Sequence, residues 1–142
     1  RAAVAWPDAQ EEVDRQRGIG SQGYCMGGPF AVWTAAAVPN RVRAAASFHG
    51  GGLVRPNDRL SPHVQMVSTQ AGILVAISRD DHAKAPSDTE VLQDLAPRLG
   101  RGSTTKVYDG DHGWTVPDSP AYAPAAEAES WDDLMQLYAA NL

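Results

Sequence analysis

Short strand-like segments alternate with helix-like segments along this chain of 142 residues. The clearest strand is expected over 72–78, where an apolar run from Ile73 to Ile77 precedes Ser78. Further strands are expected over 18–24, 42–49 and 104–108, and helices over 29–38, 89–99 and 123–142. This alternation predicts an α/β fold, a three-layer sandwich in which helices cover a mostly parallel sheet.

Two regions depart from the alternation. Residues 2–15 have the composition of a helix that Pro7 interrupts. Residues 53–70 contain several turn-forming residues and no clean period, so we expect an irregular excursion there. No repeat, low-complexity tract or internal linker divides the chain, and residues 1–142 are expected to form a single domain.

The composition argues against several classes of protein. A net charge of −5 without a basic patch disfavours a nucleic acid as partner. No apolar run approaches the roughly 18 residues that cross a bilayer, and the N-terminus lacks the layout of a signal peptide. The single cysteine excludes an internal disulfide framework and any site with several thiolates. We therefore expect a cytoplasmic protein without a membrane partner.

The junction between the first expected strand and the next helix reads Gly-Tyr-Cys-Met-Gly over 23–27. A sharp strand-to-helix turn that presents a nucleophile needs small residues two positions before and after it, here Gly23 and Gly27. Such a turn places Cys25 at a helix N-terminus, where the helix dipole favours the thiolate. The N–H of Met26 is then expected to be one oxyanion-hole donor. A small buried core residue is the alternative interpretation of a lone cysteine.

Two further residues follow strands that are expected to end at the same edge of the sheet. Asp81 follows the strand over 72–78, and His112 follows the strand over 104–108. The chain order nucleophile, acid, histidine is that of the α/β-hydrolases. We expect His112 to deprotonate the thiol and Asp81 to fix the tautomer of the imidazole, with the adjacent Asp80 as the alternative acid.

The sequence resembles the dienelactone hydrolases of the α/β-hydrolase superfamily from about residue 18 to the last helix. The matching motifs are Gly-Tyr-Cys-Met-Gly-Gly (23–28), Ser-Phe-His-Gly-Gly (47–51), Asp-His (81–82) and His-Gly-Trp (112–114). The resemblance implies Cys25 as catalytic thiol, Asp81 as acid and His112 as base. It further implies hydrolysis of dienelactones and related small esters or lactones through an acyl-thiol intermediate, without a cofactor.

The chain also departs from that family. The family fold has more sheet, and its first strands precede the nucleophile turn. The resemblance therefore implies a partial fold without those N-terminal strands, which supply the second oxyanion N–H, a carboxylate that gates the thiol and part of the substrate pocket. The strand over 18–24 is polar at Ser21 and Gln22, which is unusual for a buried central strand. We expect it to be an exposed sheet edge through which the chain forms a homodimer or exchanges an element.

Three ring-bearing side chains neighbour the expected triad. His49 closes a strand at the same edge, Trp114 follows the base, and Tyr24 precedes the thiol. We expect all three to line the substrate site, with core packing as an equal alternative for Trp114. A metal site made from His49, His82 and His112 has no supporting ligand spacing, so neither a metal nor a cofactor is expected.

The leading hypothesis is thus a hydrolase of small esters or lactones that uses Cys25, His112 and Asp81. A second hypothesis is a catalytically silent domain that acts as an oligomerising or binding module. A third is a redox-sensing thiol, since an exposed cysteine of low pKa is readily oxidised.

Overall fold

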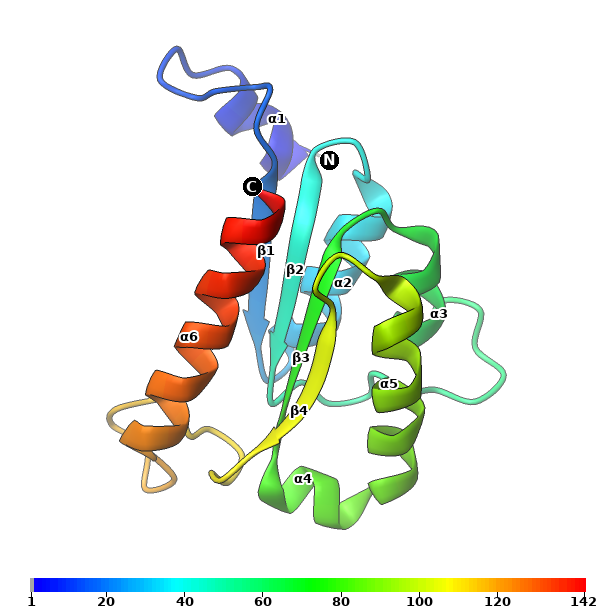
Figure 1. The fold of residues 1–142 in the computed structure, drawn as a ribbon, viewed down its shortest axis with the longest axis vertical. Coiled ribbons are helices and arrows are strands. Elements are labelled where there is room, and N and C mark those ends of the chain that lie inside the picture. Colours follow the sequence, from blue (N-terminus) through cyan, green and yellow to red (C-terminus); the bar gives the residue numbers. More distant parts are fainter. Residues whose placement is uncertain (1) are drawn as a thin grey trace.

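Four parallel strands form one sheet in the computed structural model, which describes residues 2–142 (Figure 1). The strands are β1 (Ile19–Tyr24), β2 (Val42–Phe48), β3 (Gly72–Ser78) and β4 (Thr104–Tyr108). Each strand pairs with the next one along the chain, so the spatial order is β1-β2-β3-β4. The predicted parallel sheet is confirmed, and all four strands end at the lower edge of the sheet in Figure 1.

Helices cover both faces of this sheet, as the three-layer prediction required (Figure 1). The helices are α1 (Ala2–Asp8), α2 (Gly27–Ala37), α3 (Pro62–Ser68), α4 (Arg79–Lys84), α5 (Pro86–Leu99) and α6 (Pro124–Asn141). Helices α2, α3 and α5 pack on one face, and α6 packs on the other.

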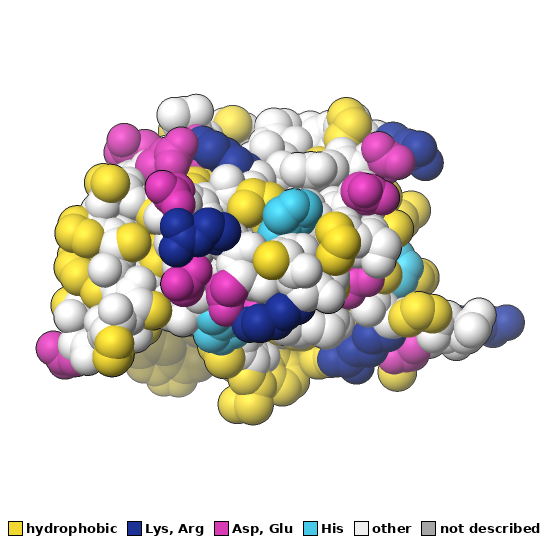
Figure 2. All heavy atoms as spheres, turned by 90° about the horizontal axis from the view of Figure 1, so that it is seen from below, with side chains coloured by type: hydrophobic (Ala, Val, Ile, Leu, Met, Phe, Trp, Pro, Cys, Tyr) yellow, Lys and Arg dark blue, Asp and Glu magenta, His cyan; other side chains and the backbone are white. Residues whose placement is uncertain are grey.

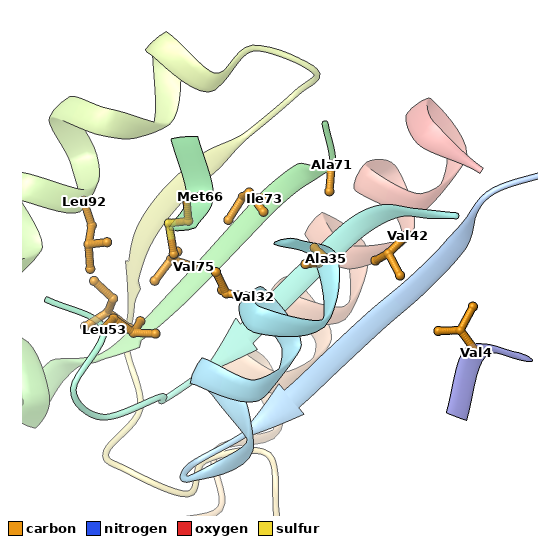
Figure 3. Close-up of a cluster of buried hydrophobic side chains, with 12 residues drawn as sticks. Val4, Val32, Ala35, Val42, Leu53, Met66, Ala71, Ile73, Val75 and Leu92 are labelled. Carbon is orange, nitrogen blue, oxygen red and sulfur yellow. The ribbon is translucent and has the colours of Figure 1, made fainter. Parts of the chain in front are cut away.

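The core has two parts because successive side chains of a strand point to opposite faces. On one face, Ile73 and Val75 of β3 pack against Val32 of α2, Met66 of α3 and Leu92 of α5 (Figure 3). On the other face lies a cluster made by β2, β3, β4, the loop after β4 and α6, which includes Phe48, Leu74, Tyr108, Trp114 and Leu134. Strand β3 is buried along its whole length, which matches its unbroken apolar sequence.

Strand β1 lies at the edge of the sheet among the described residues, since it pairs only with β2. Its polar side chains are explained by this position. The Gln22 amide donates to the hydroxyl of Tyr24 over 2.9 Å, and the hydroxyl of Tyr138 on α6 donates to the Gln22 carbonyl oxygen over 2.8 Å. Residues with weak strand propensity thus form a strand because β2 and α6 hold them there.

Two local predictions were wrong, and one short helix was not predicted at all. The excursion over 53–70 contains helix α3, which begins with Pro62 in its first turn, where proline is tolerated. The segment after β3 forms helix α4, whose first turn is capped by Ser78: its hydroxyl accepts a hydrogen bond from the N–H of Asp81. The first helix ends at Asp8 rather than near residue 15, and Asp8 is held there by an ion pair with Arg41 at 2.6 Å.

No helix within residues 2–142 combines the length and the apolar character that a membrane crossing requires.

Candidate active site

The carboxyl ends of the four strands bring the predicted site residues to one edge of the molecule, because parallel strands all end on the same side. Cys25 follows β1, His49 follows β2, Asp81 lies in α4 after β3, and His112 follows β4. Figure 2 views this edge and shows histidine, acidic and basic side chains intermixed across it.

The turn after β1 has the backbone of a nucleophile elbow. Cys25 has a φ of 51°, in the left-handed region that only a constrained turn imposes on a non-glycine residue. A Cβ atom on Gly23 would collide with the carbonyl oxygen of Gly27, so a side chain is excluded at Gly23, as predicted. A Cβ on Gly27, however, would meet nothing within 4 Å. The close approach on that side is at Gly28 instead, where a Cβ would collide with the hydroxyl of Ser47.

His112 lies between the thiol and a carboxylate. Its Nε2 is 3.2 Å from Cys25 Sγ, and its Nδ1 is 2.6 Å from Asp81 Oδ2. The hydroxyl of Ser78 donates to the same carboxylate oxygen over 2.6 Å and so fixes the acid in turn. Both contacts of the ring are within proton-transfer reach. The sequence analysis missed Ser78, although Ser78-Arg79-Asp80-Asp81 has the spacing of a helix capping motif.

Two neighbouring carboxylates share Lys84 as a partner but differ in how they contact His112. Asp80 accepts a hydrogen bond from the backbone N–H of His112 over 2.8 Å and forms an ion pair with Lys84 at 2.7 Å. Asp81, in contrast, contacts the imidazole ring itself. Asp80 therefore holds the loop that carries His112, whereas Asp81 faces the ring, which distinguishes the two candidates for the acid.

The hydrogen bonds of this chain shift the pKa values toward a charged pair. The bond to His112, followed by the N–H of Met26, lowers the pKa of the Cys25 thiol. Burial opposes the protonation of His112, but the bonds to Asp81 and Cys25 outweigh burial and raise the pKa of the ring. Burial likewise opposes the ionisation of Asp81, and the bonds from Ser78 and His112 outweigh it and lower that pKa. These directions favour thiolate and imidazolium over thiol and neutral imidazole.

Of the three side chains expected to line the substrate site, only Tyr24 is open to solvent. Its side chain, 38% exposed, borders a hollow of about 310 Å³ together with Phe48, Thr115 and Val116. Of the two interpretations of Trp114, the structure shows core packing: its ring is fully buried and stacks on Tyr108, because the loop after β4 folds under α6.

His49 is also not placed to touch a substrate, since it is only 3% exposed. Both of its ring nitrogens have protein partners, the N–H of Cys25 at 3.2 Å and the hydroxyl of Thr115 at 3.1 Å. The prediction that His49 lines the pocket is therefore corrected: the ring lies beneath the site. Thr115 went unnoticed in the sequence because nothing in its local pattern marks it.

Two other hollows help to delimit the site. One of about 200 Å³ is bordered by Asp81, Lys84 and the glycine loop 50–52. A larger one of about 570 Å³ lies between α3 and α5 and includes none of Cys25, Asp81 and His112 among its lining residues. Within residues 2–142, no group of three or more His, Cys, Asp or Glu side chains has the arrangement of a metal site.

Comparison with known proteins places this geometry in a family. The sequence profile of the "Dienelactone hydrolase family" matches residues 1–142. A "Putative carboxymethylenebutenolidase" from Synechocystis sp. is 27% identical over 144 residues, which cover 99% of this chain and 57% of that protein. A "Carboxymethylenebutenolidase" from Rhodococcus opacus is 29% identical over 131 residues, which cover 89% of this chain and 51% of that protein.

A solved structure shares the fold. A "Putative Dienelactone Hydrolase" from Klebsiella pneumoniae superposes with a TM-score of 0.75 at 18% identity, over 96% of this chain and 57% of that one. The chain thus spans about half the length of the curated relatives that it matches. On the match of the family profile to the whole sequence, this chain belongs to the dienelactone hydrolase family, a family of hydrolases.

Proposed function

We propose that this chain hydrolyses small esters or lactones, with Cys25 as nucleophile, His112 as general base and Asp81 as the residue that orients His112. The observation that carries this proposal is the continuous contact from Cys25 Sγ to His112 Nε2 at 3.2 Å and from His112 Nδ1 to Asp81 at 2.6 Å. The two relatives named as carboxymethylenebutenolidases support a lactone or a related ester as the substrate class.

In the acylation step, His112 Nε2 holds the proton that the Cys25 thiol has lost. The sulfur attacks the carbonyl carbon, and the electron pair of the C=O bond moves to the oxygen. We expect the N–H of Met26, the N-cap residue of α2, to donate a hydrogen bond to the negatively charged oxygen. When the tetrahedral intermediate collapses, the C–O bond breaks and His112 gives its proton to the departing oxygen. In a lactone, that oxygen stays attached to the acyl group.

In the deacylation step, His112 removes a proton from a water molecule, which attacks the thioester carbon. The C–S bond then breaks and the sulfur leaves as the thiolate that His112, protonated once more, stabilises. The net reaction consumes one water and yields an acid and an alcohol from an open-chain ester, or one hydroxy acid from a lactone. Asp81 keeps Nδ1 of His112 protonated throughout, so that Nε2 faces the sulfur in both steps.

Release of p-nitrophenol from p-nitrophenyl acetate tests the proposal. We expect the wild-type chain to turn over, and Cys25→Ala and His112→Ala to lose at least about 100-fold in kcat/KM while remaining folded by circular dichroism. His63→Ala is the matched control, because His63 lies on α3, outside the triad, and its Nδ1 contacts only Ser61.

Two outcomes would contradict the proposal. A folded wild-type chain without turnover would favour a silent binding module instead. Rapid oxidation of Cys25 by peroxide in a chain without esterase activity would favour a redox role for the exposed thiol.

A further inference from the structure

The backbone at the end of β2 is as constrained as the elbow beside it. His49 has a φ of 39°, in the left-handed region that bulky residues avoid. Its N–H donates to the carbonyl of Ala76 in β3 over 2.8 Å, so the neighbouring strand holds this backbone in place. Two non-glycine residues in strained conformations, Cys25 and His49, therefore lie side by side at the ends of β1 and β2.

The partners of its ring nitrogens determine the tautomer of His49. The backbone N–H of Cys25 donates to Nδ1 over 3.2 Å and also to the carbonyl of Phe48 over 3.0 Å. Because a backbone N–H can only donate, Nδ1 must accept and carries no proton. Nε2 then carries the proton and donates to the hydroxyl of Thr115, 3.1 Å away. The neutral ring thus links the elbow after β1 to the loop after β4.

The His49 ring also packs against His112 and against the buried ring of Trp114. The centroid of the His49 ring is 4.8 Å from that of His112, and it meets the buried ring of Trp114 edge-on at 5.0 Å. Burial is the main cause, and the nearby His112 the second, of a His49 pKa that is lowered to about 4. His49 consequently stays neutral when His112 is protonated, which avoids two like charges in contact.

We propose that His49 is a positioning residue of the active site: it holds the backbone of Cys25 through Nδ1 and supports the ring of His112 by packing, so that sulfur and imidazole stay in contact. The proposal rests on the triad mechanism for its effect on turnover. Its effect on the thiol itself does not depend on whether the chain hydrolyses esters.

A matched pair of substitutions separates the two ring nitrogens. In His49→Asn, the amide oxygen occupies about the position of Nδ1 and keeps an acceptor for the N–H of Cys25, and asparagine tolerates a left-handed backbone. In His49→Gln, the amide reaches the position of Nε2 and keeps the contact to Thr115 but leaves the N–H of Cys25 with Phe48 alone. Thr115→Val removes the hydroxyl that accepts from Nε2 of His49 and leaves the His49 side chain unchanged.

The first measurement is the pH dependence of Cys25 alkylation by iodoacetamide, which reports the thiolate fraction. We expect the midpoint in Thr115→Val to stay close to that of the wild type, and the midpoint in His49→Asn to move less than that in His49→Gln, because Asn keeps the acceptor for the Cys25 N–H. The midpoint in His49→Gln should move upward, because a loosened elbow weakens the bond between Cys25 and His112 that stabilises the thiolate. The alkylation midpoint of each variant is measured below its own melting temperature, so that unfolding does not contribute to the reactivity of Cys25.

The second measurement is turnover of p-nitrophenyl acetate. We expect kcat in His49→Gln to fall about 10-fold or more with KM nearly unchanged, because the positioning of the reacting groups is lost and substrate contacts are not. Equal alkylation midpoints for the Asn and Gln variants, or a rise in KM without a fall in kcat, would overturn the proposal. If the wild type has no turnover, the proposed function fails, and the alkylation midpoints alone still decide the role of His49.

Discussion

At the residue scale, the elbow depends on one glycine more than on the other. The backbone at Cys25 is left-handed, and the preceding strand must pass close to the carbonyl of Gly27. Gly23 and Gly27 look equivalent in the sequence, since both flank the thiol at the same spacing. The structure distinguishes them, because only Gly23 lies against backbone that a side chain would displace.

Alanine at these two positions should therefore have opposite effects. Gly23→Ala should lower the free energy of unfolding by about 2–3 kcal/mol or more, since the added Cβ collides with rigid backbone. Gly27→Ala should change it by less than about 1 kcal/mol and in the favourable direction, because the Cβ meets open space in the first turn of α2. Urea denaturation measures both, and equal losses would contradict the collision.

The buried imidazole of His49 makes stability dependent on pH. Its folded pKa is lowered to about 4 by burial and by His112, with Asp81 and Asp80 acting in the opposite direction. The unfolded chain therefore binds a proton that the folded chain does not, from about pH 6.5 down to pH 4. The raised pKa of His112 has the opposite effect on stability. It stabilises the folded chain fully below pH 6.5, and this stabilisation is lost as the pH rises through the folded pKa of His112.

The free energy of unfolding should thus fall by about 3 kcal/mol between pH 6.5 and pH 4 in the wild type. In His49→Asn this decrease should largely disappear, because asparagine does not titrate in that range. Denaturation curves at several pH values measure the slope. An unchanged slope in the variant would mean that His49 is protonated in the folded protein.

The residues of the site differ in how far the sequence could predict them. Asp81 follows the strand with the clearest apolar pattern, Cys25 is marked by the Gly-Tyr-Cys-Met-Gly motif rather than by its strand, and parallel strand ends place both near His112. Ser78 was assigned no role because the helix that it caps, α4, was not predicted. Thr115 was assigned none because it acts through a contact with His49, in a distant segment of the chain. His49 was predicted at the correct edge of the sheet, but it is buried rather than exposed there. The local sequence does not indicate how deeply a residue after a strand is buried.

At the scale of elements, the buried strands were easier to predict than their surroundings. The bounds of β3 and β4 match the predicted segments; the unbroken apolar run of β3 is typical of a buried strand, and β4 contains three residue types that favour strands, Thr, Val and Tyr. The short helices α3 and α4 were missed, since one or two turns leave too few residues to establish a period. Strand β1 has little strand propensity of its own and depends on pairing with β2.

The open edge of β1 leads to a prediction about assembly. Its backbone groups on the side away from β2 have no strand partner among residues 2–142, and such edges tend to pair with another chain. We propose that two copies associate through β1 as a symmetric dimer. Light scattering at micromolar concentration should give the mass of two chains, and amide exchange should slow in β1 as concentration rises. A monomer with unchanged exchange in β1 would contradict the proposal.

At the scale of the whole molecule, the sequence was sufficient to predict the fold class. It was not sufficient to predict which residues surround the substrate. Alternation along the chain was sufficient for a parallel sheet with helices on both faces. The relatives are about twice as long as the matched region, so the substrate pocket of the proposed enzyme is only partly described by these four strands. Of the three side chains expected to line that pocket, only Tyr24 borders a hollow at this edge of the sheet.

The order of the strands has a consequence for how the site comes into being. Because every strand pairs with its immediate successor, strands can join the sheet in the order of synthesis, from β1 to β4. The thiol belongs to the first strand of that series, and its base follows the last. During folding, Cys25 is thus an ordinary thiol until β4 docks and brings His112 to it. The part of the lowered Cys25 pKa that comes from His112 consequently arises only after β4 has paired with β3.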